Sequence, residues 1–221
     1  MQTFATPAPI SALLDIPAGQ VRFIAADRDD TTVEVRPADP AKSRDVKVAE
    51  QTVVEYGDGV LRITAEAKNQ LFGASGYIEV TVQLPAGSRV EAKAASADVR
   101  GVGRLGEVAF EGSHGSVKLD EAAGLRLATH AGDVTVGRLT GPAEISTGKG
   151  DIRITEAVRG TLDLTTRAGD VTVDAAAGVS AALDAGTSYG RIHNALTNSG
   201  GAAALTIRAT TSYGDITARS L

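Results

Sequence analysis

A short glycine–aspartate motif repeats along the second half of this 221-residue chain, and it limits the available folds more than any other feature. The motif is a small residue, Gly, Asp, a β-branched residue, any residue and a second β-branched residue. Its clearest copies are Ala131–Val136, Lys149–Ile154 and Ala168–Val173. Weaker copies are Ser96–Val99, His114–Leu119, Tyr189–Ile192 and Tyr213–Ile216. The aspartate position therefore falls at residues 98, 116, 133, 151, 170, 191 and 215, with steps that lengthen from 17 or 18 to 24 residues.

Each repeat contains two runs in which apolar and polar residues alternate, separated by turns. A second glycine follows most of the aspartate positions by eight or nine residues, at Gly106, Gly124, Gly141, Gly160, Gly178 and Gly200. Alternation with a period of two predicts strands. A solenoid stacks equivalent residues of successive coils about 4.8 Å apart, which explains the steady glycine and aspartate columns. We therefore predict an all-β fold: a parallel β-solenoid, of the β-helix or β-roll kind, with 17–24 residues per coil.

The residues before the repeats predict an irregular, β-rich N-terminal cap, because a solenoid has to cover its open ends. We place this capping region at residues 1–75 and the solenoid repeats at residues 76–221. The dipeptide Asp58-Gly59 after Gly57 predicts a hairpin turn. Residues Pro40–Arg44 have room for one helical turn. The expected strands are Ile10–Ile16, Val21–Ala25, Thr31–Val35, Val46–Glu55 and Val60–Thr64.

Composition excludes several functional classes. The net charge is −5 and aromatic residues make up 4% of the chain, which argues against nucleic-acid binding. Cysteine is absent, so disulfides, thiolate zinc sites and cysteine nucleophiles are excluded, and no cofactor is expected. We expect no signal peptide and no membrane span. The sequence thus predicts a cytoplasmic protein, and the alternative is a cell-surface protein exported by a non-classical route.

The chain resembles the bacterial putative-adhesin family of β-strand-repeat proteins, a domain of unknown function. The resemblance rests on the Gly-Asp-[Val/Ile] repeat, on the run Val80–Val90 and on the closing Ser212–Ile216. It covers residues 75–221 well and the front part more loosely. It implies a β-solenoid with an adhesin-like interaction role, and it brings no catalytic residues to this chain.

The aspartate column is the first candidate site. Its members are Asp98, Asp133, Asp151, Asp170 and Asp215. Stacked carboxylates suit a hard cation such as Ca²⁺, and carboxylates some 5–10 Å apart suit glycoside hydrolysis. An aspartate after glycine also stabilises a turn with its own side chain, and Ser116 and Arg191 interrupt the column. The pattern therefore favours a turn-forming role, with Asp133, Asp151 and Asp170 as the acidic column of the alternative.

The second candidate site lies at the C-terminal end of the solenoid. Tyr189 and Tyr213 occupy equivalent positions in the last two repeats, and Asp215 follows the second of them. Tyrosine is favoured at protein interfaces. We therefore predict a non-enzymatic interaction or scaffold protein that binds a protein partner, or itself, through this end. The alternative is a carbohydrate-binding or carbohydrate-active β-helix, with or without a cation on the aspartate column.

Overall fold

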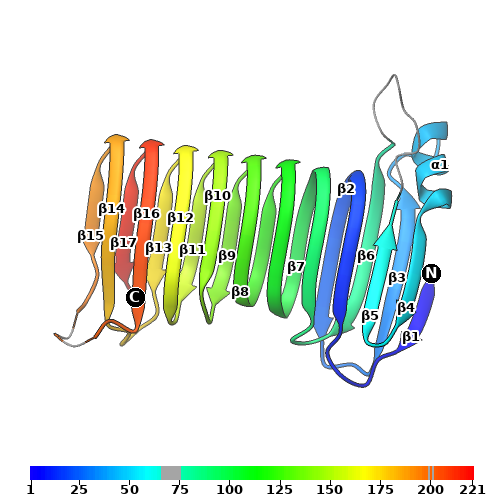
Figure 1. Ribbon diagram of the computed structural model, residues 1–221, viewed down its shortest axis with the longest axis horizontal. Helices are drawn as coiled ribbons and strands as arrows, with labels where there is room; N and C mark the ends of the chain where they lie inside the picture. The colour runs from blue at the N-terminus through cyan, green and yellow to red at the C-terminus, as the bar shows by residue number, and fades with distance from the viewer. Residues whose placement is uncertain (66–75, 199, 201) are drawn as a thin grey trace. The chain divides into compact units, whose positions relative to one another are not determined.

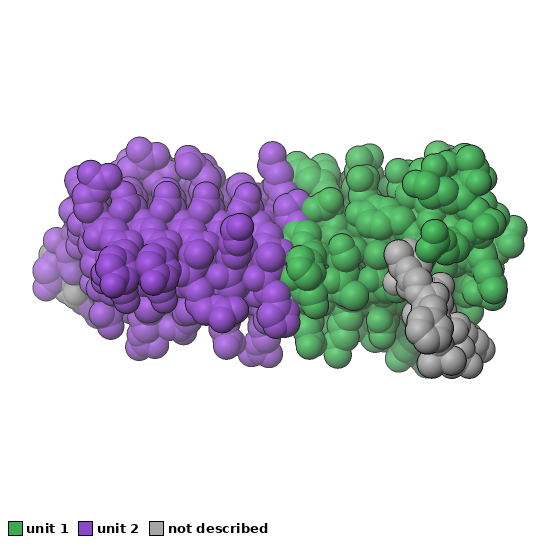
Figure 2. All heavy atoms as spheres, turned by 90° about the horizontal axis from the view of Figure 1, so that it is seen from above, with its two compact units in different colours: residues 1–115 green, residues 116–221 purple. Residues whose placement is uncertain are grey.

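The computed structural model describes residues 1–65, 76–198, 200 and 202–221 (Figure 1). The chain forms two units, residues 1–115 (unit 1) and residues 116–221 (unit 2), coloured separately in Figure 2. The predicted boundary between 1–75 and 76–221 adjoins residues 66–75, which lie outside the described residues, and it stays a prediction.

Unit 2 is a stack of parallel coils, each made of two strands on opposite sides. Its strands are β8 (Val117–Ala131), β9 (Val134–Leu139), β10 (Ala143–Lys149), β11 (Ile152–Ala157), β12 (Gly160–Ala168), β13 (Val171–Ala175), β14 (Ala181–Tyr189), β15 (Ile192–Ala195), β16 (Leu205–Tyr213) and β17 (Ile216–Ser220). Val134, Ile152 and Val171 are register partners in parallel ladders. The predicted parallel β-solenoid is thus confirmed.

The core of unit 2 consists of the inward-facing residues of these strands. Ile152 and Ile154 of β11 are fully buried, as are Val171 and Val173 of β13. Leu139 is fully buried at the other corner of its coil. Burying one such aliphatic side chain stabilises the fold by roughly 1.5–3 kcal/mol. The alternation of apolar and polar residues in the sequence therefore indicates which side chains fill the inside of the coils.

The last two coils stack in the reverse of chain order, which the repeat spacing does not predict. Strand β16 pairs with β12 on one side and with β14 on the other. In the same way, β17 lies between β13 and β15. Figure 1 shows the red β16 between the yellow β12 and the orange β14. Strands β14 and β15, residues 181–195, therefore form the terminal coil of the stack.

Charges across the coils explain this order. Nη1 of Arg208 on β16 lies 3.5 Å from Oδ1 of Asp163 on β12. Stacking in chain order would instead bring Asp163 opposite Asp184, and like charges directly opposite each other destabilise a sheet.

A second ion pair selects the same order. Arg219 of β17 donates from Nε and Nη2 to the two carboxylate oxygens of Asp174 of β13, at 2.7 and 2.9 Å. The Asp174 side chain is only 2% exposed. In chain order it would face Ala195, which leaves a buried carboxylate without a cation.

Unit 1 combines parallel and antiparallel strands. Its elements are β1 (Gln2–Ala5), β2 (Ser11–Ala26), β3 (Asp30–Pro37), α1 (Ser43–Gln51), β4 (Val53–Gly57), β5 (Val60–Thr64), β6 (Ile78–Pro85) and β7 (Arg89–His114). Strand β2 runs parallel to β7 on one side and to β5 and β6 on the other. Strand β3 is antiparallel to β6 and β1, and β4 is antiparallel to β5. These antiparallel strands and α1 form the irregular β-rich N-terminal cap.

The predicted hairpin turn at Asp58-Gly59 is confirmed. Gly57 and Val60 are register partners, and the two loop residues have φ values of 51° and 74°. Positive φ at both positions is typical of a type I′ turn, which glycine and aspartate tolerate.

The predicted strand Val46–Glu55 is wrong over its first part, because helix α1 occupies residues Ser43–Gln51. The helix is also longer than the single turn predicted at Pro40–Arg44. Asp45 in its first turn is buried and accepts hydrogen bonds from the backbone N–H groups of Asp39 and Tyr77, at 3.2 and 2.9 Å. These tertiary contacts override the alternating pattern of the local sequence.

We predict that Arg219→Ala lowers the free energy of unfolding by about 2–3 kcal/mol, because Asp174 then stays buried without its charged donor. Arg208→Ala is the matched control. It removes an arginine that bridges the same two coils, but through a pair exposed on both sides, so its effect should stay within about 1 kcal/mol. Urea unfolding of the three proteins measures both values. Equal losses would contradict the role given to the buried pair.

Candidate functional site

Four of the five predicted column aspartates lie at one corner of unit 2, where each coil passes from its first strand to its second, and Asp98 lies on β7 of unit 1. The glycines at this corner of unit 2 have φ values between 140° and 159° at Gly132, Gly150, Gly169, Gly190 and Gly214. A Cβ atom on Gly169 would overlap the carbonyl oxygen of Gly150. The corner therefore requires glycine both for its backbone conformation and for the close approach of neighbouring coils.

The aspartate side chains join neighbouring coils. Oxygen Oδ1 of Asp133 accepts a hydrogen bond from the backbone N–H of Asp151 at 2.9 Å, and that of Asp151 accepts one from Asp170 at 2.8 Å. The Asp215 N–H donates to Asp170 at 2.7 Å, and the Arg191 N–H donates to Asp215 at 2.8 Å. Each of these four carboxylates therefore bonds to the neighbouring coil, whereas the sequence analysis expected a bond within its own turn.

The same contacts bear on the alternative roles of Asp133, Asp151 and Asp170. In each of them Oδ1 is used by a backbone donor of the next coil. Within the described residues, no three or more His, Asp or Glu side chains are arranged to hold a metal ion. Neither a cation row nor a pair of catalytic carboxylates has a specific observation in its favour.

A threonine column supports the corner, and the sequence analysis missed it. Thr166 and Thr211 each donate from Oγ1 to a glycine carbonyl of the neighbouring coil, Gly150 and Gly169, at 3.0 Å. Thr187 donates to Gly214 at 3.0 Å in the same way. The available signal was the spacing Thr-x-x-Gly, which also occurs at Thr129 and Thr147.

Arg191 ends the aspartate column. It takes the aspartate position in the terminal coil, and its guanidinium lies 3.1 Å from Oδ2 of Asp215. Two donors of Arg191 hold the pKa of Asp215 below its ordinary value of 3.8. The hydrogen bond from the backbone N–H has the larger effect and the one from the guanidinium the smaller. An aspartate at this position would have no further coil to accept from, whereas arginine neutralises the last carboxylate of the column.

The predicted tyrosine pair is present beside this corner. The rings of Tyr189 and Tyr213 are stacked, with centroids 5.0 Å apart and an angle of 3° between their planes. The two residues are 68% and 61% exposed. The structure therefore brings Tyr189, Tyr213 and Asp215 together on two adjacent coils, with Arg191 as a fourth member that the prediction did not include.

The terminal coil is open on its outer side. Among the described residues, β14 pairs only with β16, and β15 pairs only with β17. The inward-facing column becomes exposed here, since Ile216 of β17 is buried while its register partner Ile192 is 46% exposed. The core of unit 2 thus reaches solvent at this coil.

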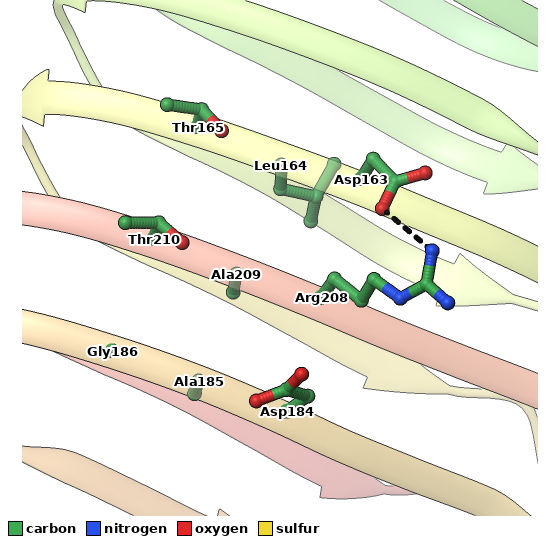
Figure 3. A pocket seen from close by; sticks show the side chains of 9 residues that line it. All are labelled: Asp163, Leu164, Thr165, Asp184, Ala185, Gly186, Arg208, Ala209 and Thr210. Atoms are coloured by element: carbon green, nitrogen blue, oxygen red, sulfur yellow. Dashed lines mark hydrogen bonds and ion pairs between the residues drawn. The ribbon is translucent and has the colours of Figure 1, made fainter.

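A shallow hollow lies on the outer face of β12, β16 and β14, with a volume of about 420 Å³. Figure 3 shows Arg208 between Asp163 and Asp184, and Thr210 between Thr165 and Gly186. The dashed line marks the Arg208–Asp163 ion pair. All these outward-facing groups are exposed, and they form one row of alternating charge and one neutral polar row.

These features define an all-β solenoid whose corner side chains hold its coils together and whose terminal coil exposes aromatic, aliphatic and charged groups. No helix in the described part of the chain is long and apolar enough to span a membrane. The sequence matches the model of the family Toastrack DUF4097 over residues 14–219. The chain therefore belongs to this family.

Solved structures share the fold at low sequence identity. A putative adhesin from Bacteroides fragilis NCTC 9343 is 13% identical, with a TM-score of 0.59 over 98% of this chain and 95% of the other. A putative adhesin from Parabacteroides distasonis ATCC 8503 is 16% identical, with a TM-score of 0.50 over the same shares. No curated protein matches this sequence. The resemblance to putative adhesins predicted from the repeat is thus confirmed at the level of family and fold.

We predict that Gly169→Ala strongly destabilises unit 2, because the added Cβ overlaps the Gly150 carbonyl and the residue must keep a φ of 155°. The expected loss of unfolding free energy is about 2–4 kcal/mol. Gly186→Ala is the control, since its Cβ would meet no atom within 4 Å. Thermal and urea unfolding compare the two. A Gly169→Ala protein as stable as the control would contradict the corner geometry.

We predict that the attachment of the terminal coil weakens in acid. Because folding lowers the pKa of Asp215, its contribution to stability is present above pH 3.8 and is lost as the pH falls through the lowered value. The ¹³C carboxyl signal of Asp215 should titrate below its ordinary pKa. Protection of the Arg191 amide, measured as its exchange rate relative to the intrinsic rate at each pH, should be lost over the same range.

Arg191→Gln provides the comparison for this titration. It removes the guanidinium and leaves the backbone donor, so the pKa of Asp215 should rise part of the way toward 3.8. An unchanged titration in this variant would show that the guanidinium does not act on Asp215.

Proposed function

We propose that this chain is a non-enzymatic interaction module whose contact surface is the outer end of unit 2. The surface comprises the terminal coil with Tyr189 and Arg191, together with Tyr213 and Asp215 of the adjacent coil. The observation that carries the proposal is the exposed, parallel stack of two tyrosines beside an unpaired coil edge.

The energetics of this surface support a binding role. Tyr189, Tyr213 and Ile192 are three of the six large apolar residues that the described chain exposes. Exposed aromatic residues next to a charged residue are the usual anchors of protein interfaces. Arg191 supplies that charge, with its side chain 89% exposed.

The use of the acidic residues argues against an enzyme. In Asp133, Asp151 and Asp170 one carboxylate oxygen is engaged by the next coil, which leaves these groups poorly placed for acid–base work. The structures of similar fold with the higher TM-scores are described as putative adhesins, which agrees with a binding role.

Photo-crosslinking in the native host tests the proposal. A photoreactive residue at Tyr189 should give adducts, and one at Val53 should not, because Val53 is 52% exposed on β4 and lies in unit 1. An adduct of twice the chain mass identifies self-association, and any other discrete mass identifies a partner. Adducts at neither position, or equally at both, would overturn the proposed surface.

The cellular compartment stays a prediction. We propose the cytoplasm, and display at the cell surface by a non-classical route is the alternative. Fractionation of the host, with detection of the native chain, decides between them. Recovery in the cell-surface fraction would overturn the cytoplasmic assignment without affecting the proposed contact surface.

A further inference from the structure

The backbone of the terminal coil ends an unfinished hydrogen-bond ladder. At the corner, four motif glycines of unit 2 donate their N–H to the coil that follows in the stack, as Gly169 does to Tyr213 at 2.9 Å and Gly214 does to Tyr189 at 3.0 Å. Gly190 is the next donor in this series, and its N–H has no acceptor among the described residues. The ladder is thus ready to continue by one more strand.

The edge of β14 carries little that would block such a strand. Residues 181–195 contain no proline, and β14 and β15 show no irregular register with their neighbours. The start of β14 is covered, since Ala181 donates its N–H to the Thr197 carbonyl at 3.1 Å. Beyond that point, proline and register irregularity, two protections common on edge strands, are missing from the described residues, and the charges of Asp184 and Arg191 remain.

Charges on the terminal coil define what an added strand must carry. Asp184 has no ion pair among the described residues, and Arg191 lies seven positions after it with its side chain 89% exposed. On the inner side of the coil, Arg208 is the register partner of Asp184, and Asp215 bonds to Arg191. Arg208 and Asp215 are also seven positions apart. The coil is therefore complementary to a basic residue followed seven positions later by an acidic one.

The aromatic stack adds a third requirement. Tyr213, five positions after Arg208, lies under Tyr189 with parallel rings. The outer face of the Tyr189 ring is exposed, and a planar side chain at the same position of an added strand would extend the stack.

We infer that the outer edge of the terminal coil binds an extended protein segment that adds as a parallel strand beside β14. The segment carries a basic residue opposite Asp184, a planar residue opposite Tyr189 and an acidic residue opposite Arg191. This inference rests on the proposed function and specifies how the partner is recognised. Backbone hydrogen bonds supply the affinity in this mode, and the side chains supply the register.

A peptide with the sequence of residues 205–220 is the probe, because this segment already meets all three requirements on the inner side of the coil. Titration of the fluorescently labelled peptide with the full chain should give saturable binding. A peptide with Arg208→Asp and Asp215→Arg keeps the composition similar and reverses both charges, and it should bind about tenfold more weakly at low salt. Equal binding of the two peptides, or binding of neither, would overturn the inference.

The position of the bound peptide is read from amide signals of the isotopically labelled chain. Strand addition should shift the signals of β14 and protect the Gly190 amide from exchange, while those of β12 stay unchanged. Shifts in β12 would mean that the peptide replaces β16 inside the stack, which would also overturn the inference. Asp184→Asn in the chain should weaken binding of the original peptide, and Thr155→Asn on the exposed face of β11 should not.

The two proposals fail in distinguishable ways. Crosslinks at position 189 in the host together with no peptide binding would leave the contact surface in place and remove strand addition as its mode. Absence of crosslinks at position 189 would remove the surface itself.

Discussion

The structure of unit 2 depends on the hydrogen bonds that join neighbouring coils at the glycine–aspartate corner. The glycine carbonyl accepts from a threonine hydroxyl of the neighbouring coil, and the aspartate Oδ1 accepts from that coil's backbone. Every coil therefore satisfies its polar groups only when another coil lies beside it. Such a stack is stable in its interior, whereas the polar groups of a terminal coil lack the partners that a further coil would supply. Arg191 replaces part of what a further coil would supply. Its guanidinium neutralises Asp215, and its side chain needs no backbone donor from another coil.

The reversal of the last two coils also follows from contacts between neighbouring coils. Apolar content favours the observed order, because chain order would place Asn194 of β15 beside the fully buried Val173, where Ala218 of β17 now lies. The charged residues differ: Arg208 and Arg219 fit opposite Asp163 and Asp174, whereas Asp184 and Ala195 do not. The buried pair adds to this discrimination, because a carboxylate that is 2% exposed is destabilising without its partner. One consequence is that Tyr189 lies on the outermost coil although Tyr213 follows it in the chain.

The sequence predicts the parts of the fold that have a fixed period. The glycine–aspartate spacing predicts the parallel register of Val134, Ile152 and Val171, and the paired tyrosine positions predict the aromatic stack. Two features lie outside any period. Strand β2 joins the parallel ladder of β7 without carrying the motif, and α1 forms where Val46 and Val48 alternate as in a strand, because Asp45 is held by distant backbone donors. The coil order could be predicted from the matched spacing of opposite charges and from Asn194 at a core position, but both signals become informative only once the coils are known to stack.

The functional interpretation depends on which polar groups the fold already uses in its own hydrogen bonds. At the corner, Oδ1 of Asp133, Asp151 and Asp170 accepts a backbone hydrogen bond from the next coil, so a row that resembles a metal or sugar site in the sequence also joins the coils. In unit 1, antiparallel strands β3 and β4 pair with the edges of the parallel strands β6 and β5, and β1 pairs with β3. The described part of unit 2 has no such strand beside the terminal coil. This difference between the two units is the reason for proposing that a further segment adds at the terminal coil, because exposed parallel edges with apolar side chains associate unless they are covered. The residues that distinguish this edge from an unprotected one are charged, and charges at an edge select a partner more than they strengthen its binding.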